Sequence, residues 1–178
     1  MNEVCLVLGS ARCLWSDIEA YKAIGEHHAV VAVKQAGMYW PGPLAAWVTL
    51  HPYMMPEFIA ERARLGYPAA KVVGHEKSGS VDEAFDYKWP GAPKTAASGM
   101  AGAKYAAFDL GYKKIVLCGI PMDPGPRIDG KGLWSENQTL SFRRGIEPVA
   151  PDVRRFVRSM SGWTAGMFGK PTREWLES

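Results

Sequence analysis

The sequence predicts an α/β fold, a Rossmann-like three-layer domain with a mainly parallel sheet. Three observations support this prediction. Residues 4–8 and 114–118 are short, nearly continuous apolar runs, the pattern of strands buried on both faces, and each run is followed by a glycine. Helix-like segments alternate with strand-like ones along the chain, as in βαβ units. The chain has 178 residues, so we expect residues 1–178 to form one domain.

The first half of the chain supplies most of the expected sheet. Buried strands are predicted at 4–8, 29–33, 45–50 and 71–74. The Ser16 to Glu19 spacing is that of a capping box and predicts a helix that runs to about Gly25. Prolines and a glycine within 38–43 predict irregular structure there. A proline in a first turn and a glycine after a last turn predict a helix over 56–66.

The second half predicts one more strand, at 114–119, and several helices. The expected segments are an ordered loop or partly helical insertion over 75–97, a helix over 99–110, a lid-like segment over about 124–145, a helix over 152–160 with an apolar stripe, and a short helix over 172–177. Residues 152–178 together are expected to form a C-terminal helical segment that packs back on the domain.

Composition and charge narrow the function classes. The chain has 21 basic and 18 acidic side chains and a formal net charge of +3, a smaller excess than a dedicated nucleic-acid binder carries. Its 3 cysteines are odd in number and are expected to be reduced thiols. No window reaches the roughly 18 apolar residues of a membrane span, and no signal peptide is recognisable. We therefore expect a cytoplasmic protein.

The loop after the first strand is the first candidate binding segment. Ligands of open parallel sheets bind beyond the carboxyl ends of the strands. Gly9, Ser10, Ala11 and Arg12 offer there a flexible backbone, a hydroxyl and a guanidinium, which suit an anion or a ribose. The glycine spacing of a dinucleotide fingerprint and the lysine of a P-loop are both missing. The alternative is a glycine-ended turn with an incidental arginine.

The second candidate segment is 95–102, which opens the helix expected over 99–110. Ser98 is the expected N-cap, and no acidic side chain occupies the first turn beside Gly99. Such a helix end can bind a phosphate or carboxylate through amides that the helix dipole makes partly positive. The alternative is that the small residues serve only close packing of the helix on the sheet.

Two further residues are candidates for proton transfer. Asp123 follows the strand at 114–119 and suits a ribose hydroxyl, a cation or an acceptor hydroxyl, or else caps a turn. His51 ends the third strand and is either a base or a structural histidine. The histidines and cysteines lack metal-ligand spacing, so no zinc site is expected. The arginines of 143–158 form a solvated helix face, or contact an acidic acceptor or a second subunit of a homo-oligomer.

Three motifs together resemble a known group of proteins. They are LVLGSARCL at 6–14, TAASGM at 95–100 and LGYKKIVLCGI at 110–120. They resemble the group that joins Campylobacter-type sialyltransferases with the MptE-like (6-hydroxymethylpterin diphosphokinase-like) proteins. The resemblance covers about residues 4–123. Sialyltransferases of this type use a histidine in a lid after the last of these strands, whereas this chain has no histidine beyond His75.

The resemblance implies a ligand and an activity. It places Gly9, Ser10 and Ala11 beside the phosphate and sugar of a nucleotide, Gln35 or Lys34 where the group has an asparagine, and Ser98 with Gly99 beside the phosphate or base. The leading expectation is a glycosyltransferase that takes a nucleotide or nucleotide-sugar donor and a small acceptor, with Asp123 or His51 as the base. The alternatives are a diphosphoryl transferase of the MptE-like type, for which Mg²⁺ dependence is the mark, and a non-catalytic nucleotide-binding protein.

Overall fold

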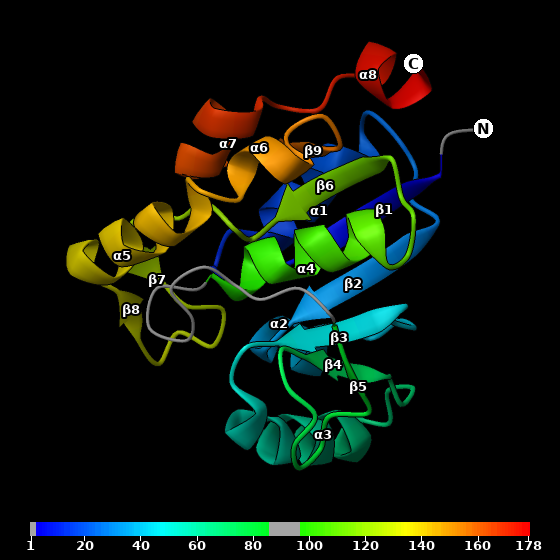
Figure 1. The fold of residues 1–178 in the computed structure, drawn as a ribbon, viewed down its shortest axis with the longest axis vertical. Helices are drawn as coiled ribbons and strands as arrows, with labels where there is room; N and C mark the ends of the chain where they lie inside the picture. The colour runs from blue at the N-terminus through cyan, green and yellow to red at the C-terminus, as the bar shows by residue number, and fades with distance from the viewer. Residues whose placement is uncertain (1–2, 86–96) are drawn as a thin grey trace.

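A seven-stranded parallel sheet forms the centre of the molecule (Figure 1). The structure, a computed structural model, describes residues 3–85 and 97–178. The strand order is β5-β4-β3-β2-β1-β6-β9, and every neighbouring pair is parallel. The strands are β1 (Val4–Leu8), β2 (Ala29–Val33), β3 (Ala46–Thr49), β4 (Val72–Gly74), β5 (Glu83–Ala84), β6 (Lys114–Cys118) and β9 (Val157–Ser159). The predicted α/β class and parallel sheet are confirmed.

Helices cover both faces of the sheet and bury two apolar cores. On one face lie α1 (Leu14–Lys22), α2 (Gln35–Tyr39), α3 (Met55–Arg64) and the C-terminal α8 (Arg173–Glu177). On the other face lie α4 (Ser98–Phe108), the end of α5 (Glu136–Ile146), α6 (Ala150–Val153) and the end of α7 (Gly162–Phe168). Successive residues of β1 alternate between the cores: Leu6 and Leu8 face the first and Cys5 and Val7 the second. The strands β1 and β2 are therefore apolar throughout.

The strand order fixes where a ligand site can form. From β1 the chain builds outward through β2, β3, β4 and β5, and it then returns to pair β6 with the other edge of β1. Leu8 is in register with Cys118, so the loops after β1 and β6 leave the sheet side by side. A reversal of this kind opens a crevice at the carboxyl ends of the strands.

Two local predictions in the first half were wrong. The helix α1 begins at Leu14, and the Ser16 hydroxyl donates to the carbonyl of Cys13 instead of capping the helix. Serine makes this bond inside a helix when the chain enters the helical conformation upstream of it. A capping box is found instead at Ser135 and Gln138, at the start of α5. The helix α2 also extends into the segment expected to be irregular, because the first helix-breaking proline comes only at residue 41.

The expected helix over 152–160 is instead the end of α6 followed by the strand β9. Three of its four apolar positions, Val153, Phe156 and Val157, are buried as predicted, and Met160 is half-buried. The conformation is determined by the edge of β6, where Val157 pairs with Ile115. The helix predicted over 172–177 is confirmed as α8, with the Thr172 side chain as its N-cap. The expected insertion over 75–97 contains β5, and residues 86–96 of it lie outside the described residues. In the described part of the chain, no helix is both long and apolar enough for a membrane span.

Candidate functional site

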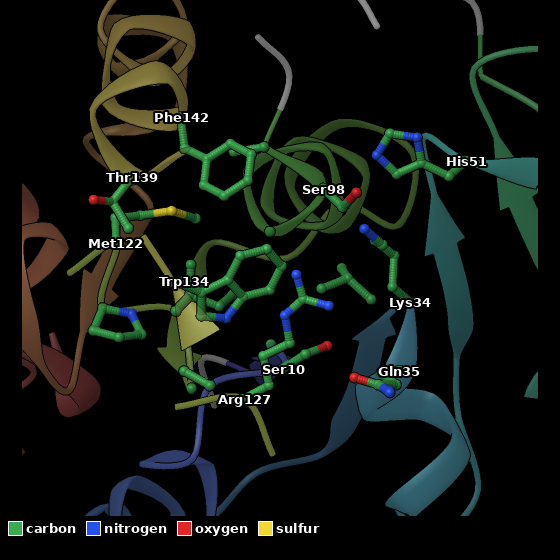
Figure 2. Close-up of a pocket in the computed structure, with 18 of the residues that line it drawn as sticks. Ser10, Lys34, Gln35, His51, Ser98, Met122, Arg127, Trp134, Thr139 and Phe142 are labelled. Carbon is green, nitrogen blue, oxygen red and sulfur yellow. The ribbon is translucent and has the colours of Figure 1, made fainter. Parts of the chain in front are cut away.

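A pocket of about 250 Å³ lies at the carboxyl ends of β1, β2, β3 and β6 (Figure 2). Its floor is formed by the loops that follow these strands and by the start of α4. One wall of the pocket is formed by α5 and by a small hairpin of β7 (Gly125–Pro126) and β8 (Leu133–Trp134). The volume is close to the lower end of the roughly 300–1,000 Å³ of small-molecule sites, so the pocket has room for one small ligand.

Glycines let the loops after β1 and β6 touch at the floor. A Cβ on Gly9 would lie 2.3 Å from Cγ1 of Ile120 and 2.4 Å from the carbonyl oxygen of Gly119. Gly119 has a φ of +69°, which favours glycine, and its own Cβ would meet the carbonyl oxygen of Gly9. The close contact brings the amides of both loops to one end of the pocket.

The start of α4 forms another part of the floor. The N-cap is Ala97, so Ser98 is the first helical residue and not the expected cap; Ser98 is buried and lines the pocket. The first turn holds no acidic residue, and within the described part of the chain the N-cap residue Ala97 has no side-chain cap hydrogen bond. A Cβ on Gly99 would lie 2.8 Å from Ile120, so this glycine lets the helix end approach the loop after β6. Of the predicted segment 95–102, residues 95 and 96 lie outside the described residues.

Backbone strain is concentrated at the pocket. Lys34, at φ +46°, and Met122, at φ +55°, are the two non-glycine residues in the described part of the chain with positive φ. Both line the pocket. A side chain in this region of φ costs on the order of 1–3 kcal/mol, and such residues cluster at functional sites. Lys34 is held there by its carbonyl, which accepts a hydrogen bond of 2.6 Å from the Trp47 indole.

Cationic and neutral nitrogen groups face one another across the pocket. Burial, with the nearby Arg127 charge, lowers the pKa of Lys34 to about 8. Burial, with the charges of Lys34 and His75, lowers the pKa of His51 to about 4, so His51 is neutral at pH 7. Figure 2 shows Lys34 and Arg127 reaching into the same space, beside Ser98 and His51. This space suits an anion.

The hairpin is attached to the strand-end loops by hydrogen bonds. The amide of Ile128 donates to the carbonyl of Ser10 at 2.9 Å, and the amide of Arg12 donates to the carbonyl of Pro126 at 3.1 Å. The Gln35 side-chain amide donates to the Asp129 carboxylate at 2.9 Å. The hairpin therefore forms a fixed wall of the pocket and carries Arg127 and Trp134 into it.

The structure gathers eight of the nine expected site residues around this pocket. The lining residues among them are Gly9, Ser10, Ala11, Gln35, His51, Ser98, Gly99 and Asp123. Arg12 is exposed and does not line the pocket, because its backbone pairs with the hairpin and turns the side chain outward. Arg127 supplies the guanidinium that the sequence had led us to expect from Arg12.

Two of the gathered residues are already engaged. The Asp123 carboxylate accepts a hydrogen bond of 2.6 Å from Arg143 and one of 3.1 Å from the amide of Trp163. The two carboxylate oxygens thus link the loop after β6 to α5 and α7. This bonding is closer to the structural role expected as the alternative for Asp123, the capping of a turn, than to the role of a free base. The Gln35 amide nitrogen is likewise bonded to Asp129.

Sequence reasoning did not select Arg127, Trp134, Thr139 or Phe142 as site residues, although they line the pocket. Lys34 was considered only as an alternative to Gln35. The one signal for Arg127 was its place in the lid-like segment that follows a strand end. No group of three or more histidine, cysteine or acidic side chains suited to a metal ion is found among residues 3–85 and 97–178.

Fold and site together define a class: α/β proteins with a parallel sheet and a small-molecule pocket at the strand switch point. Within this class the chain is similar to solved sialyltransferases of Campylobacter jejuni. It matches the sialyltransferase CstII in complex with cytidine-5'-monophosphate with a TM-score of 0.60 and 14% identity, over 96% of this chain and 86% of that chain. It matches the same enzyme in complex with the substrate analogue CMP-3FNeuAc with a TM-score of 0.59 and 14% identity, over 99% and 87%.

A third similar structure is the monofunctional alpha-2,3-sialyltransferase Cst-I of Campylobacter jejuni, with a TM-score of 0.56 and 12% identity, over 99% of this chain and 82% of that chain. At these identities the similarity shows a shared fold. The sialyltransferase side of the expected resemblance is thus supported at the level of fold, and the MptE-like side is not. No protein-family model matches the chain, and no curated protein matches it.

Proposed function

We propose that this chain is a transferase that binds a nucleotide-activated sugar in the pocket and moves the glycosyl group to a small acceptor. One observation carries the proposal: the pocket lies at the strand switch point of a fold shared with sialyltransferases solved in complex with CMP and with a CMP-sugar analogue. The two loops expected to bind the nucleotide, 9–11 and 98–99, meet at the floor of this pocket. The pocket is lined by both apolar and polar side chains, as small-molecule and cofactor sites commonly are, and such a lining is compatible with a nucleotide.

In this proposal the nucleotide phosphate lies against the start of α4. The partly positive helix end there, whose first turn holds no acidic residue, stabilises the negative charge that grows on the leaving phosphate. Gly9 and Gly99 let the loop after β1 and the start of α4 pack against the loop after β6, which brings their amides to the floor. The segment 124–145, with its hairpin and the first part of α5, covers the ligand on the side of Trp134 and Phe142.

His51 is the proposed proton acceptor. The acceptor hydroxyl oxygen attacks the anomeric carbon, the bond from that carbon to the phosphate oxygen breaks with its electron pair on the phosphate, and the hydroxyl proton goes to a ring nitrogen of His51. The ring is neutral at pH 7 and, among the described residues, makes no hydrogen bond through its nitrogens. Asp123 is proposed as a positioning residue, because Arg143 and Trp163 already hold its carboxylate.

A second candidate function is nucleotide binding without turnover. The observation in its favour is the engagement of Asp123, which leaves His51 as the sole remaining member of the expected pair of bases. The two candidates share the pocket and differ in what they require of His51.

The test is a thermal-shift screen with CMP, CMP-sugars, UDP-sugars, ATP and GTP, each with and without Mg²⁺. A ligand that binds only the native state stabilises it by about 2.7 kcal/mol when its concentration is a hundred times Kd. The melting temperature therefore rises. Ser98→Tyr fills the pocket and should abolish the shift, whereas Ser78→Tyr, at an exposed position outside the pocket, should keep it. No shift with any nucleotide, or an undiminished shift in Ser98→Tyr, contradicts the proposal.

Turnover separates the two candidates. With the nucleotide-sugar that gives the largest shift, release of the free nucleotide is measured in the presence of simple sugar acceptors. Loss of a general base costs roughly 10²–10⁴ in rate, so His51→Ala should reduce release by about that factor while it still binds the donor. Binding without any release in the wild-type protein would favour the second candidate.

A further inference from the structure

Two cationic side chains from different parts of the chain share the centre of the pocket. Lys34 comes from the end of β2 and Arg127 from the hairpin, and each lines the pocket. Neither has a carboxylate partner within 4.0 Å in the described part of the chain. We propose that Lys34 and Arg127 form a two-cation clamp that binds the phosphate of the ligand, and that Asp129 positions Arg127 in it.

The side chain of Arg127 is held in place before any ligand arrives. Its guanidinium lies over the Trp134 ring, 4.3 Å from the centroid. A Cβ on Gly132 would lie 3.4 Å from Cδ and Nε of Arg127, so this glycine leaves room for the arginine between itself and the indole. Stacking of this kind fixes the orientation of the planar guanidinium group. In a fixed orientation this group can donate hydrogen bonds to two oxygens of one phosphate.

A buried nitrogen without a partner points to a missing ligand. The Nε of Arg127 is buried and makes no hydrogen bond within the described part of the chain. A buried donor left unpaired costs about 1–3 kcal/mol in the free protein. A phosphate oxygen in the pocket is the kind of acceptor that this guanidinium lacks.

Asp129 connects the clamp to the floor of the pocket. One of its oxygens accepts the hydrogen bond from Gln35, the residue after Lys34, and the other accepts from the amide of Lys131 at 3.0 Å. These bonds and the bond from Ile128 to Ser10 fix the turn that carries Arg127 at the end of β2. The two cations are thereby held at one place although they are far apart in sequence.

The hydrogen bond from the Lys131 amide, with that from Gln35 and the Arg127 charge, lowers the pKa of Asp129, so this carboxylate offsets part of the positive charge of the clamp. Arg143 already pairs with Asp123, and Glu57 is exposed on α3 at the pocket wall. His51, at the end of β3, is neutral at pH 7, and burial together with Arg127 lowers the pKa of Lys34 to about 8. A bound phosphate raises the pKa of Lys34, so binding takes up a proton near and above pH 8.

The inference rests on the proposed function only in taking the ligand to be a nucleotide. The test is calorimetric titration of the full chain with CMP. Arg127→Gln and Lys34→Met should each weaken CMP binding by at least about tenfold, as loss of a charged hydrogen bond does. The matched control is Arg12→Gln, the same change at the exposed arginine outside the pocket, which should stay within about twofold of wild type. Arg127→Lys, which keeps the charge, should recover part of the loss.

Asp129→Asn should weaken CMP binding less than Arg127→Gln, and the double variant should add nothing to Arg127→Gln, because Asp129 acts through the arginine. Between pH 7 and 9.5 the affinity of the wild type should fall above pH 8, by up to about tenfold per unit, whereas Lys34→Arg should remain flat. Equal affinities of Arg127→Gln and Arg12→Gln, or a flat wild-type profile, would overturn the clamp.

Failure of the proposed function gives a different result. If the wild-type protein binds no nucleotide, it is titrated with inorganic phosphate and pyrophosphate. Binding of either anion that is lost in Arg127→Gln and kept in Arg12→Gln supports the clamp without the nucleotide. Absence of anion binding as well overturns both proposals.

Discussion

Lys34 combines two unfavourable features in the free protein, a positive φ and a desolvated charge. Its ammonium is buried near Arg127, and its backbone adopts a conformation that glycine would occupy without strain. The arrangement makes sense if a ligand supplies the missing negative charge, since functional groups are commonly maintained at the expense of stability.

The first prediction at this scale is that Lys34→Met stabilises the protein. A pKa lowered from 10.5 to about 8 disfavours the charged form in the native state, and after allowance for partial exposure the gain is about 1–3 kcal/mol at pH 7. Since the native pKa lies below the unfolded one, the cost is present below pH 8 and disappears as the pH rises toward 10.5.

Denaturant unfolding at pH 7 and pH 10.5 checks this prediction. The variant should be more stable than wild type at pH 7, and the difference should shrink at the higher pH. Lys22→Met, at an exposed position on α1, serves as control and should change stability by less than about 0.5 kcal/mol. A destabilised Lys34→Met would show that the lysine contributes to packing more than its charge costs.

At the scale of elements, the contact between the loops after β1 and β6 is the most constrained feature of the site. Gly9→Ala would place a methyl group 2.4 Å from the backbone oxygen of Gly119, so one loop must move. We expect a loss of about 2–4 kcal/mol in stability and a weaker nucleotide-induced thermal shift. Gly125→Ala is the control: its Cβ meets nothing within 4 Å, and it should be nearly neutral. Equal behaviour of the two variants would contradict the described floor.

Elements with a complete local signal could be predicted from the sequence. The apolar runs of β1 and β6 lack the alternation of an amphipathic element, and the short helix predicted over 172–177 is α8. The β9 segment could not be predicted, because the apolar positions Val153, Phe156 and Val157 fit a helix as well as they fit a short helix followed by a strand. The pairing of Val157 with β6 decides between them, and that contact is far away in sequence.

At the scale of the whole molecule, the sheet order brings distant residues together. The strand-end rule was enough to select the part of the pocket floor that follows β1, β2, β3 and β6, whereas Ser98 and Gly99 were selected because they open a helix. It could not select Arg127 over Arg12. The choice depends on the hairpin, which binds back to Ser10 and Gln35 through long-range hydrogen bonds that no local pattern in the sequence announces.

Another long-range link holds the floor from the opposite face of the sheet. Asp17, buried on α1, accepts hydrogen bonds of 2.8 Å from the amide of Gly119 and from the hydroxyl of Ser161. Asp17 lies between Ser16 and Glu19, the residues predicted to form a capping box, and the structure uses its carboxylate to fix the end of β6. Both faces of the sheet thus contribute to the geometry of one pocket.

The central claim is that a nucleotide binds at the switch point with its phosphate between α4 and the hairpin. A crystal structure of the protein with CMP tests it most directly. We expect phosphate oxygens within hydrogen-bond distance of the Ser98 or Gly99 amide and of Arg127, with Lys34 beside them. A nucleotide bound elsewhere, or bound in this pocket with its phosphate turned away from Lys34 and Arg127, would contradict it.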